Sequence, residues 1–188
     1  MFNAKTQDNF LSLEETTKLV EALSVTDGWE RSPVEFWDNR VINTPRVSEL
    51  FGPEIDSLVF ESTMKVKDFI IKEYGLEEDI IPDIVSLCRW FPGMEQPPHA
   101  DDMTNSDVKG FEHRVFGAII YLNDNYEGGK TYYPTHGIEV TPKAGSLAVH
   151  PGDPEHLHGV TKIEGNVRYT IASFWTYDKT KSYVFSAH

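Results

Sequence analysis

The sequence predicts an α+β fold in which supporting helices come first and short β-strands follow. Two segments before residue 80 carry apolar residues at helical spacing, while the chain after Pro82 carries short β-rich segments separated by turn signals such as GG at 128–129 and PGDP at 151–154. Helices followed by many strands are typical of an α+β chain with a sandwich or jelly-roll core. At 188 residues, one domain is expected.

The two helices are predicted from periodicity and end signals. The first runs from Ser12 to Leu23, where leucines and Val20 recur at helical spacing, Ser12 is a cap residue and two glutamates occupy the first turn. The second runs from about Pro53 to Tyr74 with an apolar period near 3.6, and Gly75 follows as a stop signal. The apolar face of this second helix is expected to pack against a sheet.

The strands are predicted from short β-rich segments in the second half of the chain. They are Asp83 to Phe91, Val115 to Leu122, Thr131 to Tyr133, Gly137 to Val140, Ser146 to His150 and Arg168 to Tyr177. Between the first two lies the polar, aperiodic segment from Asp102 to His113, which is expected to be a mobile loop over a site, with Gly110 as its hinge.

Composition and charge narrow the functional classes. Seventeen basic and thirty acidic residues give a formal net charge of 17 − 30 = −13, the wrong sign for a phosphate-backbone binder. We therefore expect no nucleic-acid partner, and a basic or neutral protein segment is the more natural large partner. The apolar runs are too short to span a membrane and the start, MFNAKTQDNF, lacks a secretory pattern, so we expect a cytoplasmic protein with no membrane association.

A candidate metal motif, HAD, occupies residues 99–101. His99 and Asp101 are two residues apart, a spacing that places both side chains on one face of an extended segment. Cys88 is the only cysteine, so any metal must be held by imidazole and carboxylate groups. Alone the motif is weak, because seven histidines and thirteen aspartates in 188 residues give about 0.5 chance occurrences of His-x-Asp. Two exposed loop residues remain the competing interpretation.

A second motif, HGVTKIEGNVRYTIASFW at 158–175, strengthens the first. His158 is followed ten residues later by Arg168 inside a strand-like segment. His158 together with the HAD pair would complete two imidazoles and one carboxylate, the facial triad of non-haem Fe(II) oxygenases, which leaves coordination positions open. Arg168 could alternatively be a surface strand residue paired with Glu164.

Taken in order, these motifs resemble one known family. HAD is followed by RVFGAIIYLND at 114–124, GGKTYYP at 128–134, TPKAG at 141–145 and the run from His158 to Arg168. From about Leu87 to Tyr177 the chain resembles the prolyl 4-hydroxylase branch of the 2-oxoglutarate- and Fe(II)-dependent oxygenases. The resemblance covers about half of the protein.

The resemblance implies a fold and a site. The fold would be a double-stranded β-helix (jelly-roll) core over residues 83–178 with helical support over residues 1–80, together one domain over 1–188. The iron ligands would be His99, Asp101 and His158. The C5 carboxylate of 2-oxoglutarate would be bound by Arg168 and Tyr121, in a pocket lined by Thr131, Val160 and Phe174.

It also implies an activity and its co-substrates. The chain would be a dioxygenase that converts 2-oxoglutarate and O₂ to succinate and CO₂ at Fe(II), with ascorbate keeping the iron reduced. The substrate would be a prolyl residue in a protein or peptide. Family members often carry tyrosine near the metal, where this sequence has Phe91 and Pro97.

Other interpretations remain at the sequence level. His150 and His156 compete with His158 as a ligand, and Asp102 competes with Asp101, although its odd offset from His99 turns it to the other face. Either Trp175 or its neighbour Phe174 must face the core. The iron site could instead hydroxylate a free amino acid or another small molecule, or the chain could be a non-catalytic metal-binding jelly roll.

Overall fold

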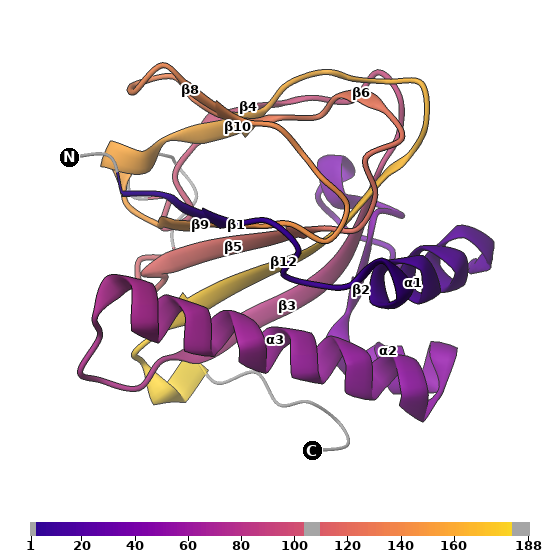
Figure 1. The fold of residues 1–188 in the computed structure, drawn as a ribbon, viewed down its shortest axis with the longest axis horizontal. Coiled ribbons are helices and arrows are strands. Elements are labelled where there is room, and N and C mark those ends of the chain that lie inside the picture. Colours follow the sequence, from indigo (N-terminus) through magenta and orange to yellow (C-terminus); the bar gives the residue numbers. More distant parts are fainter. Residues whose placement is uncertain (1–2, 104–109, 182–188) are drawn as a thin grey trace.

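A six-stranded antiparallel sheet forms the centre of the computed structural model, which describes residues 3–103 and 110–181. Facing it is a four-stranded antiparallel sheet, and a two-stranded ribbon completes the strand layers (Figure 1). The larger sheet has the order β1 (Lys5–Gln7), β9 (Leu147–Pro151), β5 (Phe116–Tyr121), β12 (Arg168–Thr176), β3 (Ile81–Trp90) and β2 (Val41–Asn43). The smaller has the order β4 (Gln96–His99), β10 (His158–Val160), β7 (Thr131–Tyr133) and β8 (Ile138–Val140), and the ribbon pairs β11 (Ile163–Glu164) with β6 (Glu127–Gly128).

Both predicted helices are present. Helix α1 (Leu13–Val25) begins directly after Ser12, whose hydroxyl accepts from the Glu15 backbone while the Glu15 carboxylate accepts from the Ser12 backbone. Helix α3 (Pro53–Tyr74) has the predicted bounds, and Gly75 ends it in the left-handed conformation at φ 63°. The short helix α2 (Val47–Phe51) precedes α3 and was not predicted.

The main hydrophobic core lies between the helices and the outer face of the larger sheet. Helix α3 runs along this face, with α1 and α2 on the same side (Figure 1). Alternation along β12 sends Ile171 and Trp175 into this core, whereas Phe174 lines the space between the sheets. Trp175 is therefore a packing residue. The core includes Leu19, Leu23, Val59, Val66, Ile70, Val85, Leu87, Ile120, Ile171 and Trp175.

The α+β prediction is confirmed, and each of the six predicted β-segments contains a strand whose ends lie within two residues of those expected. What the pattern missed are very short strands. Strands β1 and β2, both drawn from the N-terminal stretch expected to be helical support, form the two edges of the larger sheet. Each has only three residues, too few for period-two alternation to be recognised.

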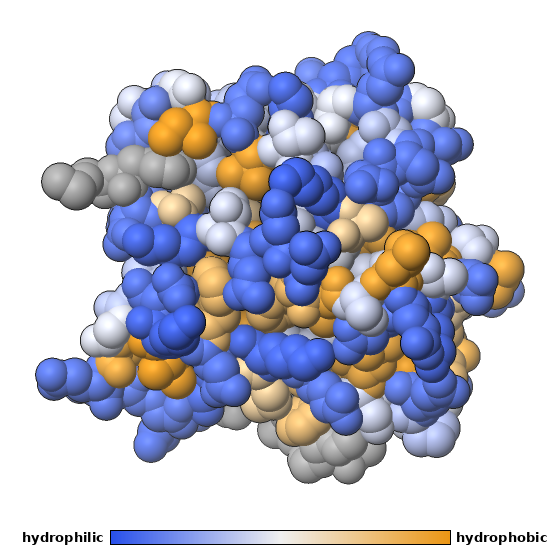
Figure 2. Space-filling view, viewed as in Figure 1, coloured by the Kyte–Doolittle hydropathy of each residue, from blue (hydrophilic) through white to orange (hydrophobic). Residues whose placement is uncertain are grey.

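The surface is mostly hydrophilic on the face seen in Figure 2, where hydrophobic residues appear in an interrupted band across the middle and in smaller areas elsewhere. This agrees with the net charge of −13. Among the helices of the described residues, none is long and apolar enough to cross a membrane.

Candidate metal centre and co-substrate pocket

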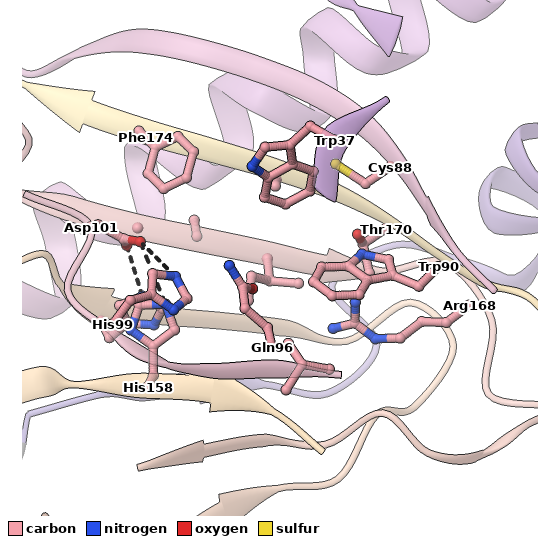
Figure 3. Close-up of a pocket in the computed structure, with 16 residues that line it drawn as sticks. Trp37, Cys88, Trp90, Gln96, His99, Asp101, His158, Arg168, Thr170 and Phe174 are labelled. Carbon is pink, nitrogen blue, oxygen red and sulfur yellow. Dashed lines mark hydrogen bonds and ion pairs between the residues drawn. The ribbon is translucent and has the colours of Figure 1, made fainter. Parts of the chain in front are cut away.

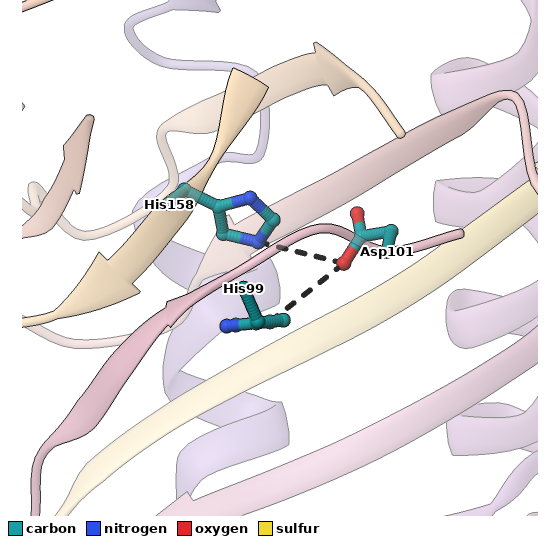
Figure 4. Close-up of side chains that lie close together, drawn as sticks. All are labelled: His99, Asp101 and His158. Carbon is teal, nitrogen blue, oxygen red and sulfur yellow. Dashed lines mark ion pairs between the residues drawn. The ribbon is translucent and has the colours of Figure 1, made fainter. Parts of the chain in front are cut away.

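Three of the predicted site residues meet between the two sheets. His99 ends β4 and His158 opens β10, and the two are direct cross-strand partners, while Asp101 follows β4 in a turn. The ligand atoms of the three side chains all lie within 4.8 Å of one another. Figure 4 shows the two imidazoles turned toward one carboxylate oxygen of Asp101, at 3.9 Å from His99 and 3.4 Å from His158.

Both imidazoles are oriented by the backbone. The Nδ1 of His99 lies 3.1 Å from the Pro97 carbonyl, and the Nδ1 of His158 lies 3.1 Å from the His156 carbonyl. A carbonyl oxygen only accepts, so each Nδ1 carries the hydrogen and each Nε2 keeps its lone pair for a metal. Two oriented imidazoles and one carboxylate fit the donor set of a non-haem Fe(II) site.

The charges around Asp101 favour its ionised form. Although burial opposes ionisation, the nearby His158 and His150 hold the pKa of this carboxyl well below its ordinary value. Burial followed by the charge of His158 lowers the pKa of His99. For His158 itself, burial lowers the pKa, but Asp101 and the His156 carbonyl together raise it by more, so the pKa is raised overall.

A third histidine, His150 on β9, is the fourth residue of the cluster. Its Nε2 lies 3.0 Å from Asp101 Oδ2 and its Nδ1 lies 2.9 Å from the Tyr133 hydroxyl. Burial, followed by the charge of His158, lowers the pKa of His150 to about 4. Sequence reasoning treated His150 only as a competing ligand and missed this contact, because β7 and β9 are brought together by the fold.

A pocket of about 70 Å³ extends from this cluster between the sheets. In Figure 3 the triad lies at one end and Arg168 with Trp90 at the other, while Trp37 and Gln96 approach the space between them from opposite sides. Alternate residues of β12 form one wall: Arg168, Thr170, Ala172 and Phe174.

Arg168 is buried but incompletely paired. It is 1% exposed, and its Nε and Nη2 have no hydrogen-bond partner among the described residues. Its guanidinium carbon lies 5.2 Å from the Trp90 ring centre and 5.3 Å from that of Tyr121. The alternative of a surface pair fails, since Arg168 is buried and no ion pair joins it to Glu164 within the described part of the chain. A buried cation with unused donors fits a carboxylate ligand.

Of the other predicted pocket residues, Val160 and Phe174 line this space, whereas Tyr121 and Thr131 are not among its lining residues. The Tyr121 hydroxyl lies 2.7 Å from Thr131 Oγ1, both side chains are fully buried, and the Tyr121 ring lies next to the Arg168 guanidinium. Val160 lines the pocket from β10. Phe174 also lines the pocket, but at the end where the triad lies (Figure 3), so it is placed to face the metal rather than Arg168.

An aromatic cluster from the N-terminal half closes the pocket. Phe36 and Trp37 pack edge-on against Trp90, and the guanidinium carbon of Arg40 lies 4.2 Å from the Trp90 ring centre. Burial and the charge of nearby Arg168 lower the pKa of Arg40 to about 10. The only sequence signal near Trp37 is the adjacent aromatic pair at 36–37, which does not distinguish a pocket residue from a packing residue.

The competing residue His156 is not brought into the triad, whereas His150 contacts it through Asp101. His156 contacts Asp153 through Nδ1 and accepts from the Asn3 backbone through Nε2.

The two positions where family members often carry tyrosine lie at the surface: Phe91 is 39% exposed, and Pro97 is exposed as well. The predicted loop over the site includes residues 104–109, which lie outside the described residues, so its role stays a prediction.

The sequence of this chain is similar to those of known proteins. A family model described as the 2OG-Fe(II) oxygenase superfamily matches residues 86–177. Prolyl 4-hydroxylase 1 of Arabidopsis thaliana is 25% identical over 121 residues, which cover 53% of this chain and 42% of that protein. The chain spans less than two thirds of the length of the curated relatives it matches.

Solved structures share the fold. The viral collagen prolyl hydroxylase vCPH from Paramecium Bursaria Chlorella virus-1, in its 2OG complex, aligns with a TM-score of 0.70 at 19% identity, covering 92% of this chain and 94% of that one. A prolyl hydroxylase from Trichoplax adhaerens, in complex with a hypoxia inducible factor peptide fragment, aligns with a TM-score of 0.73 at 16% identity, covering 95% and 85%. These similarities confirm the jelly-roll prediction. Residues 86–177 therefore match the 2OG-Fe(II) oxygenase superfamily, and in its sequence and structural similarities the chain is prolyl 4-hydroxylase-like.

Proposed function

We propose that this chain is a 2-oxoglutarate- and Fe(II)-dependent dioxygenase that hydroxylates a prolyl residue in a protein or peptide. One observation carries the proposal: a single pocket joins a His-Asp-His group at one end to a buried arginine with unused donors at the other. An iron ligand set and a carboxylate anchor in one enclosed space are what binding of 2-oxoglutarate to iron requires.

In this proposal His99, Asp101 and His158 hold the iron. When bound, the iron would supply the activation of O₂ that is coupled to conversion of 2-oxoglutarate to succinate and CO₂, with ascorbate as the reductant that keeps it ferrous. The two imidazoles and the carboxylate would hold it at the triad end of the pocket.

Arg168 binds the far carboxylate of 2-oxoglutarate. Its Nε and Nη2 form a planar fork that matches a carboxylate bidentately, and both atoms are buried with no hydrogen-bond partner among the described residues. Tyr121, hydrogen-bonded to Thr131, adds a hydroxyl beside this fork. Apolar side chains from both sheets, including Val160 and Ile119, exclude water along the pocket.

A peptide is favoured over a free amino acid as the substrate. The proteins of similar fold include a viral collagen prolyl hydroxylase and a prolyl hydroxylase in complex with a peptide fragment. The strongly acidic chain is suited to a basic or neutral peptide and not to a nucleic acid.

The test is a substrate panel supplied with Fe(II), 2-oxoglutarate and ascorbate. Proline-containing peptides, the same peptides with alanine in place of proline, and free amino acids are compared by mass gain of one oxygen and by succinate formed. We expect oxygen to be gained by the proline peptides alone. Gain on a free amino acid would assign a small-molecule hydroxylase, and metal binding without any succinate would favour the non-catalytic jelly roll.

A further inference from the structure

His150 and Tyr133 form a buried hydrogen-bond chain that ends on Asp101. Tyr133 is on β7 of the smaller sheet and His150 is on β9 of the larger one, so these hydrogen bonds link the two sheets. The Tyr133 hydroxyl lies 2.9 Å from His150 Nδ1, and His150 Nε2 lies 3.0 Å from Asp101 Oδ2. All three side chains are 3% exposed or less.

The two carboxylate oxygens of Asp101 have different partners. Oδ1 faces the imidazoles of His99 and His158, at 3.9 and 3.4 Å. Oδ2 faces His150 instead, and because a carboxylate oxygen only accepts, the His150 Nε2 must donate to it. Only Oδ1 is therefore directed at the space between the two metal-ligating imidazoles.

Packing holds this arrangement in place. Gly117 on β5 pairs with His150 on β9, and a Cβ at Gly117 would overlap Asp101 Oδ2 and come within 2.7 Å of His150 Nε2. The His150 ring also packs on that of His158, with ring centres 4.0 Å apart. Asp101 thus has little room to turn its second oxygen toward the imidazoles.

Two simpler roles for His150 do not account for its hydrogen bonds. A fourth metal ligand would need a ring nitrogen aimed at the metal, but the two nitrogens of His150 contact Asp101 and Tyr133. A residue that only fills space would not need hydrogen bonds at both ring nitrogens.

We propose that His150 and Tyr133 are positioning residues that make Asp101 bind the metal through Oδ1 alone. This inference rests on the proposed function, because it assumes a metal held by Asp101. Binding through one oxygen keeps a coordination position open that a bidentate carboxylate would fill, and the enzyme needs such positions for 2-oxoglutarate and O₂.

The experiment is an anaerobic titration of the metal-free chain with Co(II), a spectroscopic substitute for Fe(II). Calorimetry gives the affinity, and the visible d–d absorption reports the coordination number. The variants are His150→Phe, which removes the donor, His150→Gln, which keeps an N–H donor, and Tyr133→Phe, which removes only the hydroxyl. Tyr132→Phe is the matched control, because alternation places Tyr132 on the other face of β7, beside Gly159.

We expect His150→Phe to weaken Co(II) binding by about 10- to 100-fold and to change the d–d spectrum, as loss of a residue supporting a metal ligand does. His150→Gln should recover part of both, Tyr133→Phe should show a smaller loss of the same kind, and Tyr132→Phe should match the wild type. Thermal unfolding of each metal-free variant monitors folding; if His150→Phe does not fold, His150→Gln and Tyr133→Phe carry the test.

Wild-type affinity and an unchanged spectrum in the folded His150 and Tyr133 variants would overturn the inference and leave the proposed function intact. Failure of the wild-type chain to bind Co(II) would instead overturn the proposed function, and the inference with it.

Discussion

The two faces of the larger sheet bury different chemistry. The face toward α1 and α3 packs an apolar core in which Leu19, Ile70 and Leu87 are fully buried. The opposite face, toward the smaller sheet, buries charged and polar groups, among them Asp101 and Arg168. On strand β12 the residues alternate between the two faces, with Arg168 and Thr170 lining the pocket and Ile171 in the apolar core.

The difference separates stability from function. Burying apolar area stabilises a fold, whereas a buried charge without a partner destabilises it. Arg168 keeps two buried nitrogens with no hydrogen-bond partner among the described residues, which is a cost that only a ligand would offset. Substitutions on the helix-covered face should therefore change stability alone, and substitutions between the sheets should change binding and activity.

The largest effect is expected at the triad. Asp101→Ala removes the carboxylate ligand and should abolish succinate formation and reduce Co(II) binding, while the chain stays folded. Asp102→Asn, one residue along the chain, is the control and should retain turnover. Full activity in the Asp101 variant would remove the basis for the metal site.

The second-largest effect is expected for Arg168→Met. Loss of a buried ion-pairing group costs about 2 kcal/mol or more, so the KM for 2-oxoglutarate should rise about 30-fold or more. The unfolding free energy of the ligand-free chain should stay the same or increase, because a buried unpaired charge is removed. Arg31→Met, at an exposed site, is the control. A wild-type KM in the Arg168 variant would contradict the assignment of the anchor.

Ile70→Ala tests the other face. Removal of this fully buried side chain should lower the unfolding free energy by about 2–5 kcal/mol, measured by urea denaturation. Metal affinity and the KM for 2-oxoglutarate should not change below the unfolding transition. Leu13→Ala, where the side chain is 76% exposed, should change none of these quantities. A selective loss of 2-oxoglutarate binding in folded Ile70→Ala would break the separation of the two faces.

A smaller effect is expected at the start of α1. Ser12→Ala removes the hydroxyl that accepts from the Glu15 backbone and should cost about 1 kcal/mol of stability. Activity should be unchanged, because α1 lies on the helix-covered face. The measurement is again urea denaturation, with Ser24→Ala, near the other end of the same helix, for comparison.

The smallest effect is pH-dependent. Burial tends to raise the pKa of Glu15, but hydrogen bonds from Ser12 and the charge of Lys65 lower it overall. A lowered pKa in the folded state gives stability that is present above the unfolded value, near 4.5, and is lost as the pH falls through the folded value. Glu15→Gln should thus cost less than about 1 kcal/mol at pH 7 and nothing measurable at the lowest pH at which the chain stays folded.

The apolar face could largely be predicted from the sequence, and the polar interior only in part. Helix α3 carries its period and its Gly75 stop within one continuous segment. The triad was found through the family resemblance and not through HAD alone. Trp37, Arg40 and the Tyr133–His150 contact were missed, because in each case the fold packs together residues that are distant in the sequence, and no local pattern records such a contact.

The most direct test of the polar interior is an anaerobic titration of the chain with Fe(II) and 2-oxoglutarate, followed by visible absorption. If one pocket holds both, a metal-to-ligand charge-transfer band should appear only when both are present and should saturate at one iron per chain. It should be absent in Asp101→Ala and need far more 2-oxoglutarate in Arg168→Met. Iron binding with no such band at any 2-oxoglutarate concentration would contradict the account.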